Sequence, residues 1–110
     1  RNLELNRIDY VSYALLYPGV IEFGKKAPEK LLLETACGTP QGGKIKVFAD
    51  GITQEHLIAE FVLSPDFRTA HWNDYRLLET PIRKKLTGKH KLIFLAEGLG
   101  FCNLKTWRLQ

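Results

Sequence analysis

Hydrophobic residues recur along this chain in short runs. Apolar and polar residues alternate in Lys44–Val47, whereas Lys91–Leu95 is a nearly continuous apolar run. Alternation with a period of two is typical of a strand with one buried face, and a short apolar run suits a fully buried strand. The other runs that we interpret as strands are Tyr10–Leu16, Lys30–Cys37, His56–Leu63, Tyr75–Ile82 and Phe101–Leu109.

Turn-forming residues separate these runs, and no long window keeps a helical stripe. Only His56–Leu63 is ambiguous between strand and helix. Short strands at regular spacing indicate a β-sandwich or a barrel. We therefore predict an all-β fold, a jelly-roll-like β-sandwich of mostly antiparallel strands. The turn signals are Pro18-Gly19, Gly24, Gly38–Gly43, Asp50-Gly51, Ser64–Asp66, Gly88 and Gly98–Gly100.

The length and composition fit one folded domain. The chain has 110 residues, 45% hydrophobic and 25% charged, so we expect a single domain over residues 1–110. It starts at Arg1 and contains no Met, which we interpret as an internal point of a longer protein. No apolar run approaches the ~20 residues that span a bilayer, and we expect no membrane partner.

The charge is mildly basic, with 16 basic against 12 acidic residues and a net charge of +4. The basic residues fall in three short clusters, at Lys25-Lys26 with Lys30, at Arg83–Lys85 and at Lys89–Lys91. Dedicated nucleic-acid binders concentrate charge on one face, so no nucleic-acid partner is predicted. The clusters are interpreted as solvated turns and edges, with an anionic-ligand patch as the alternative.

Candidate reactive residues give no catalytic pattern. The three histidines lie in different local contexts, and no nucleophile, zinc or phosphate-loop motif is present. We therefore expect no enzymatic activity. Cys37 and Cys102 fit neither a metal-binding nor a Cys-x-x-Cys spacing. Two interpretations of them remain open, a pair of buried thiols and a disulfide between strand ends.

Six short segments, in order and spacing, resemble a family 6 carbohydrate-binding module, a β-sandwich domain appended to glycoside hydrolases. Three are Asp9–Tyr13, similar to the family's Asp-aromatic-Val-x-Tyr strand, Gly19–Gly24, similar to Val-Asp-Phe-Gly, and Gly42–Gly51, similar to Gly-x-Ile-x-Val-x-x-Asp. The others are Ala70–Tyr75, similar to the Gly-Gly-Trp-x-x-aromatic loop, Gly88–Leu95, similar to Gly-x-His-x-Leu-x-Leu-x-Phe, and Gly100–Trp107, similar to the Phe-Asn-x-Asp-Trp-Phe closing strand.

The resemblance implies a glycan-binding cleft among the loops at one end of the sandwich. Two aromatic rings would stack on a sugar, and an asparagine would hydrogen-bond it. The matching positions are Tyr13, Trp72 and Asn103. Tyr13 has the alternative of a core residue, Trp72 that of packing under its own loop, and Asn103 that of a partner for loop backbone groups. Trp107, in the closing strand, is expected in the core.

Three departures from the family modify these expectations. The family's opening Ile-Glu-Ala-Glu strand is missing, with Leu3–Leu5 as a remnant. The family's structural calcium uses that glutamate and an aspartate of the closing strand, where this chain has Lys105. An ammonium cannot ligate calcium, so we expect no cofactor. Finally, Ala14–Pro18 resembles an insertion that adds Tyr17 beside the cleft, as a fourth candidate binding residue.

These points predict a non-catalytic module that binds a polysaccharide or oligosaccharide and holds an attached glycoside hydrolase near its substrate. The alternative is a structural or interaction β-sandwich packed on a glycoside hydrolase domain, with no ligand site of its own. The resemblance also implies secretion, so an extracellular or periplasmic location is expected.

Overall fold

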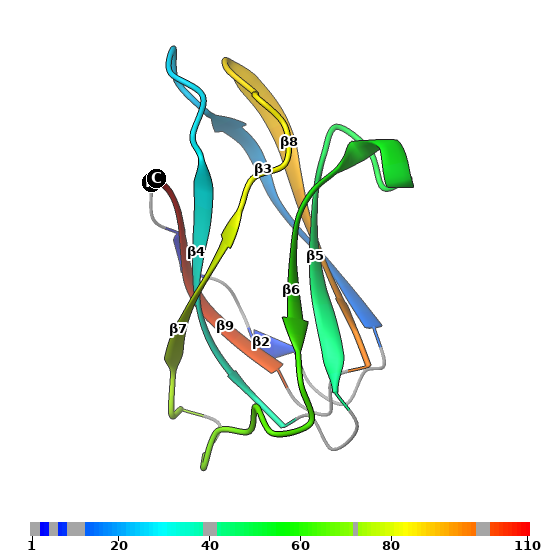
Figure 1. Ribbon diagram of the computed structural model, residues 1–110, viewed down its shortest axis with the longest axis vertical. Coiled ribbons are helices and arrows are strands. Elements are labelled where there is room, and N and C mark those ends of the chain that lie inside the picture. The colour runs from blue at the N-terminus through cyan, green and yellow to red at the C-terminus, as the bar shows by residue number, and fades with distance from the viewer. Residues whose placement is uncertain (1–2, 5–6, 9–12, 39–41, 72, 99–101) are drawn as a thin grey trace.

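The computed structural model describes residues 3–4, 7–8, 13–38, 42–71, 73–98 and 102–110, with side chains from residue 19 onward. Nearly all of these residues lie in strands or in the turns between them (Figure 1). The elements are β1 (Leu3–Glu4), β2 (Arg7–Ile8), β3 (Tyr13–Glu22), β4 (Lys30–Cys37), β5 (Gly43–Ala49), the short 3₁₀ helix η1 (Gln54–His56), β6 (Leu57–Leu63), β7 (Arg76–Pro81), β8 (Lys89–Glu97) and β9 (Cys102–Leu109).

The strands form two antiparallel sheets, which Figure 1 shows as facing layers. One sheet has the order β1-β9-β4-β7, with β2 also paired to β9, and the other has the order β3-β8-β5-β6. The predicted all-β sandwich is confirmed. Over the described ranges, the structure contains no helix of the length and apolarity that a bilayer crossing requires.

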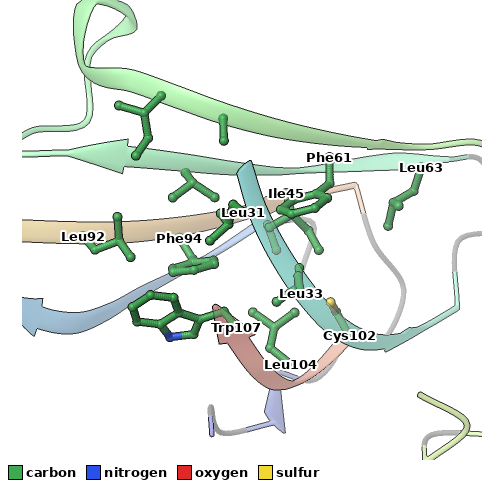
Figure 2. Packing of buried hydrophobic residues seen from close by; sticks show 14 of the residues in the cluster. Leu31, Leu33, Ile45, Phe61, Leu63, Leu92, Phe94, Cys102, Leu104 and Trp107 are labelled. Carbon is green, nitrogen blue, oxygen red and sulfur yellow. The ribbon is translucent and has the colours of Figure 1, made fainter. Parts of the chain in front are cut away.

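The core lies between the two sheets, because alternate residues of each strand point inward. Trp107 of β9 is 1% exposed and packs against Phe94 of β8, with ring centroids 5.9 Å apart and planes tilted by 48° (Figure 2). The prediction that Trp107 is a core residue is confirmed. Other inward-facing residues of this cluster are Leu31, Leu33, Ile45, Val47, Phe61, Leu63, Leu92 and Leu104.

The turn predicted at Pro18-Gly19 is wrong, because β3 continues through it to Glu22. The register against β8 shifts between Leu16 and Gly19, so that β3 carries an extra residue there. β3 is an edge strand. A proline, which has no backbone N–H to donate, is tolerated in an edge strand because one side of that strand has no neighbouring strand to bond. Gly19 has φ of +109°, which suits the kinked backbone of a bulge. Ala14–Pro18 is therefore part of β3 and its bulge.

The ambiguous run His56–Leu63 is a strand for all but its first residue. β6 and β7 lie at the edges of opposite sheets, and hydrogen bonds join them. The Arg83 amide donates to the Ile58 carbonyl at 2.7 Å, and the Thr80 hydroxyl donates to the Glu60 carbonyl at 2.9 Å. These hydrogen bonds join the two sheets along the side of the sandwich where β6 and β7 lie.

A histidine and an aspartate hold the turn that follows β5. Asp50, with φ of +66°, accepts hydrogen bonds from the Lys91 amide at 2.9 Å and from His90 Nδ1 at 2.6 Å. His90 Nε2 donates to the Thr87 carbonyl at 2.8 Å. Both ring nitrogens of His90 face acceptors, which favours the protonated ring. The hydrogen bond to Asp50 is the main reason that the pKa of His90 is raised. The same hydrogen bond lowers the pKa of Asp50.

The stability supplied by this pair should depend on pH. Since the pKa of His90 is raised from 6.5, its contribution is complete below pH 6.5 and is lost as pH rises through the raised value. Since the pKa of Asp50 is lowered from 3.8, its contribution is present above pH 3.8 and is lost in stronger acid. We therefore expect the pair to stabilise the fold most between these two values.

Urea unfolding of the unaltered chain and of His90→Gln, from pH 5 to pH 9, tests this pH dependence. The difference in unfolding free energy should shrink as pH rises. His71 is exposed and lies outside the Asp50–His90 pair, and His71→Gln serves as the control with a flat difference. A pH-independent difference for His90→Gln would contradict the expectation.

Candidate functional site

Strand ends from both sheets meet at one end of the sandwich. β3 begins at Tyr13, which pairs with Glu97 at the end of β8, and Glu97 also pairs with Lys44 near the start of β5. In the other sheet, β4 ends at Cys37, opposite Cys102 at the start of β9. These ends lie together at the bottom of Figure 1. We call this part of the molecule the loop end.

Asn103 lies at the loop end and is buried, with 2% of its surface exposed. It is the second residue of β9 and pairs with Arg7 on one side and Ala36 on the other. Its neighbours Cys102 and Leu104 belong to the core cluster, so the Asn103 side chain points to the opposite face of the sheet. The backbone carbonyl oxygen of Asn103 accepts a hydrogen bond from the Thr35 hydroxyl at 3.1 Å.

The segment 69–74 is anchored to the loop end and folded on itself. The Thr69 amide donates to the Cys37 carbonyl at 3.1 Å, at the last residue of β4. The Thr69 hydroxyl and the Asp74 amide both donate to the His71 carbonyl, each at 3.1 Å. Asp74 Oδ2 in turn accepts from the Ala70 amide at 3.1 Å. This backbone hydrogen bond is the main reason that the pKa of Asp74 is lowered.

The structure describes the four predicted binding residues in different detail. Asn103 is described in full. Tyr13 is placed by its backbone, as the first residue of β3 at the loop end. Tyr17 lies further along β3, in the bulge and away from the strand end. Trp72 lies outside the described residues, between the exposed His71 and Asn73 of the anchored segment. The segments that carry Tyr13, Trp72 and Asn103 thus share one end of the sandwich.

Charged residues at this end were missed by sequence reasoning. Lys46 Nζ lies 3.0 Å from Glu97 Oε1, so an ion pair spans neighbouring strands beside Tyr13. Arg76 Nη2 lies 3.4 Å from Asp74 Oδ2, where β7 begins. The alternation of Lys44–Val47 signals that Lys46 is on a strand, but its partner lies on β8, far along the chain. The Asp74–Arg76 pair adds hydrogen-bonding groups to the segment that carries Trp72, and the Lys46–Glu97 pair adds them to the other sheet.

Lys105 does not fit a calcium ligand. Its ammonium lies 5.4 Å from the centre of the Tyr75 ring, in the geometry of a cation–π contact. Within the described ranges, no group of three or more histidine, cysteine, aspartate or glutamate side chains is arranged to hold a metal ion. The contact with Tyr75 gives the Lys105 charge a role in tying β9 to the segment before β7.

Some surface hollows lie away from Asn103. One of them, of about 290 Å³, is lined by Leu32, Glu34, Leu77, Thr106, Trp107 and Arg108. Inside it, the Thr106 hydroxyl donates to Glu34 Oε1 at 2.5 Å. None of the predicted binding residues lines this hollow, so the candidate site rests on the loop end.

No sequence family matches this chain, and no curated protein matches it. Solved structures do match. A family 6 carbohydrate-binding module from Clostridium cellulolyticum, in complex with xylose, has a TM-score of 0.73 and 18% identity, covering 100% of this chain and 96% of its own. The module CsCBM6-3 from Clostridium stercorarium, in complex with cellobiose, has a TM-score of 0.70 and 17% identity, with coverages of 100% and 92%.

A larger enzyme also contains this fold. A glycoside hydrolase family 43 arabinoxylan arabinofuranohydrolase from Bacillus subtilis, in complex with cellotetraose, has a TM-score of 0.70 and 23% identity. The match covers 94% of this chain but only 20% of that enzyme. The chain therefore has the β-sandwich fold of family 6 carbohydrate-binding modules, and the predicted resemblance is confirmed at the level of the fold.

Proposed function

We propose that this chain, which has the fold of family 6 carbohydrate-binding modules, is a non-catalytic module that binds a polysaccharide or oligosaccharide at its loop end. One observation carries the proposal. The folded chain brings the segments of Tyr13, Trp72 and Asn103 to the same end of the sandwich, although they are far apart in the sequence. Similar modules solved with xylose and cellobiose support sugars as the ligand class.

The proposed mechanism is stacking with hydrogen-bonded orientation. Trp72 and Tyr13 offer aromatic faces to the C–H groups of a sugar ring, with Tyr17 as a further aromatic candidate. The Asn103 amide hydrogen-bonds the hydroxyls. Each ring contact contributes on the order of 1 kcal/mol beyond the area that it buries. Affinity for a single sugar unit is therefore modest, and longer glycans gain by covering more of the loop end.

The proposal includes an attached glycoside hydrolase. The fold occurs as about a fifth of an arabinofuranohydrolase chain, which supports a similar arrangement here. A module tethered to a glycoside hydrolase raises the effective concentration of enzyme at the polysaccharide. Such an enzyme works where polysaccharides are found, so we place the chain outside the cytoplasm, in the extracellular or periplasmic space.

Affinity electrophoresis and calorimetry on a glycan panel test the proposed function. The panel contains xylan, arabinoxylan, mixed-linkage β-glucan and β-1,3-glucan, with xylo- and cello-oligosaccharides for calorimetry. We expect at least one polysaccharide to retard the chain, and the matching oligosaccharide to bind measurably. If no glycan binds and the chain instead associates with a glycoside hydrolase domain, the structural alternative replaces this proposal. Binding that weakens strongly with salt would identify an anionic glycan.

The anchoring of the 69–74 segment gives a further prediction. Asp74→Ala removes the acceptor of the Ala70 amide and of Arg76, so the residues on either side of Trp72 lose two hydrogen bonds that anchor them. We expect glycan affinity to fall about 3- to 10-fold, in line with the loss of one ordinary, solvent-exposed hydrogen bond. Calorimetry measures the affinity, and a melting curve checks the fold.

Two variants control this prediction. Asp74→Asn keeps an oxygen acceptor for the Ala70 amide and should retain most of the affinity. Asp66→Ala removes an exposed aspartate from the preceding turn and should leave binding unchanged. Equal affinities for Asp74→Ala and the unaltered chain would show that the anchor does not shape the site.

A further inference from the structure

Two cysteines face each other across neighbouring strands beside the loop end. Cys37 is the last residue of β4, Cys102 is the first residue of β9, and the two are direct register partners. Their Sγ atoms lie 3.1 Å apart, although the residues are 65 positions apart in the sequence. Both are free thiols, 0% and 1% exposed. Figure 2 shows the Cys102 sulfur at the edge of the core.

The backbone around this pair suits a covalent bond between the sulfurs. The Cys37 carbonyl accepts its hydrogen bond from the Thr69 amide, in the segment that leads into β7. β7 and β9 lie on opposite sides of β4, so the backbone groups of Cys37 point away from Cys102. The cysteines thus form a non-hydrogen-bonded antiparallel pair, whose Cα atoms are typically about 4.5 Å apart. That spacing lies within the range of disulfides, about 4.4–6.8 Å.

We propose that Cys37 and Cys102 are a covalent cross-linking site, at which an intramolecular disulfide joins β4 to β9 when the chain folds in the presence of a small-molecule disulfide. The proposal rests on the register, the sulfur separation and the shared burial of the two side chains. It does not depend on glycan binding, and it holds for either function considered above.

The reaction balances with glutathione disulfide as the oxidant. The Cys37 sulfur displaces one glutathione thiolate and forms a mixed disulfide. The Cys102 sulfur then attacks the Cys37 sulfur and displaces the second glutathione thiolate. Two cysteine thiols lose two electrons and two protons, and one glutathione disulfide becomes two glutathione thiols.

In the folded, reduced chain, hydrogen bonds and burial affect the two thiols differently. The hydrogen bond from the Cys102 thiol lowers the pKa of Cys37 against the effect of burial, with a further contribution from the Thr35 hydroxyl, 3.1 Å from the Cys37 sulfur. The pKa of Cys102 is raised by its hydrogen bond to Cys37 and by burial. Since neither residue is exposed, an external oxidant reaches the sulfurs before the sheets close. Cross-linking therefore accompanies folding, and the folded, reduced chain reacts slowly.

The cross-link would act on the loop end as well as on the unfolded chain. It closes a long loop, which reduces the conformational freedom of the unfolded state. In the folded state it fixes the β4 end, on which Thr69 anchors the 69–74 segment, to the β9 start that carries Asn103. The two groups of candidate binding residues in this sheet would then be held at a constant separation.

Refolding the chain under two redox conditions tests the proposal. The denatured, reduced chain is refolded with a glutathione disulfide and glutathione buffer, or with a reductant alone. We expect the oxidised product to be monomeric, to have lost both titratable thiols and two hydrogen masses, and to yield a peptide containing both cysteines. Its melting temperature should exceed that of the reduced chain by about 10 °C.

Single-cysteine variants are the controls for this experiment. Cys102→Ala should show no redox-dependent change in melting temperature, and a Cys37→Ala chain should behave the same way. The comparison of the two redox forms of the unaltered chain needs neither variant to fold. A correctly folded chain that keeps both thiols in the glutathione buffer would overturn the proposal. Disulfide-linked dimers, or a melting temperature that does not rise on cross-linking, would do the same.

Discussion

A Trp72→Ala chain should bind its glycan about 30-fold more weakly than the unaltered chain, or not measurably. Trp72 lies outside the described residues, within a segment anchored to the loop end by Thr69, and the proposed function makes its ring the main stacking surface for a sugar. Loss of apolar burial and of stacking together costs about 2 kcal/mol, and every 1.4 kcal/mol is a tenfold change in Kd. Calorimetry with the best oligosaccharide of the panel measures the change.

The matched control removes an exposed apolar side chain at the other end of the sandwich. Ile52 is 58% exposed, in the turn after β5, and Ile52→Ala should bind as the unaltered chain does. Ile52→Ala should melt normally because its side chain is exposed, and a melting curve of Trp72→Ala shows whether that chain is folded. Undiminished binding by Trp72→Ala would remove the loop end as the site, and the search would move to the outer face of the β1-β9-β4-β7 sheet.

Trp107→Ala should destabilise the fold more than any other substitution suggested here. The side chain is 1% exposed and packs on Phe94, so its removal leaves a large cavity between the sheets. Buried tryptophan-to-alanine changes cost about 3–5 kcal/mol, a large share of the ~5–15 kcal/mol that stabilises a typical domain. We expect the melting temperature to fall by roughly 15–20 °C, measured by circular dichroism.

A Trp107→Phe chain separates packing from hydrogen bonding. Trp107 Nε1 has no hydrogen-bond partner in the part of the chain that the structure describes, so phenylalanine gives up little besides volume. We expect it to cost less than half as much as alanine. If phenylalanine and alanine were equally destabilising, the indole nitrogen rather than the ring volume would be responsible.

Local patterns predicted most of the strands, and their errors have physical causes. Lys44–Val47 falls inside β5, and Lys91–Leu95 inside β8, since alternation and short apolar runs report burial directly. The turn predicted at Pro18-Gly19 failed because proline and glycine have a second use, at a bulge in an edge strand. Whether a strand lies at an edge depends on the order of strands in the sheet, which the local sequence does not encode.

Motifs in the sequence can propose binding residues, but they do not reveal which residues of other strands lie beside them. Motif order selected Asn103, and the structure places it at the loop end with the segments of Tyr13 and Trp72. The ion pair of Lys46 with Glu97 joins β5 to β8, and only the strand register brings its members together. The roles of Tyr13, Tyr17, Trp72 and Asn103 in binding stay predictions for the experiments above to test.

The pairing of β1 with the last strand determines where linkers leave the domain. Leu3 lies opposite Trp107, and Gln110 pairs with Lys30 at the start of β4, so Leu3 and Gln110 both lie at the end of their sheet that is remote from Asn103 (Figure 1). Any polypeptide joined to either side would point away from the loop end. A fused reporter or a surface tether at either terminus should therefore leave the proposed binding face open to a bulky, insoluble polymer.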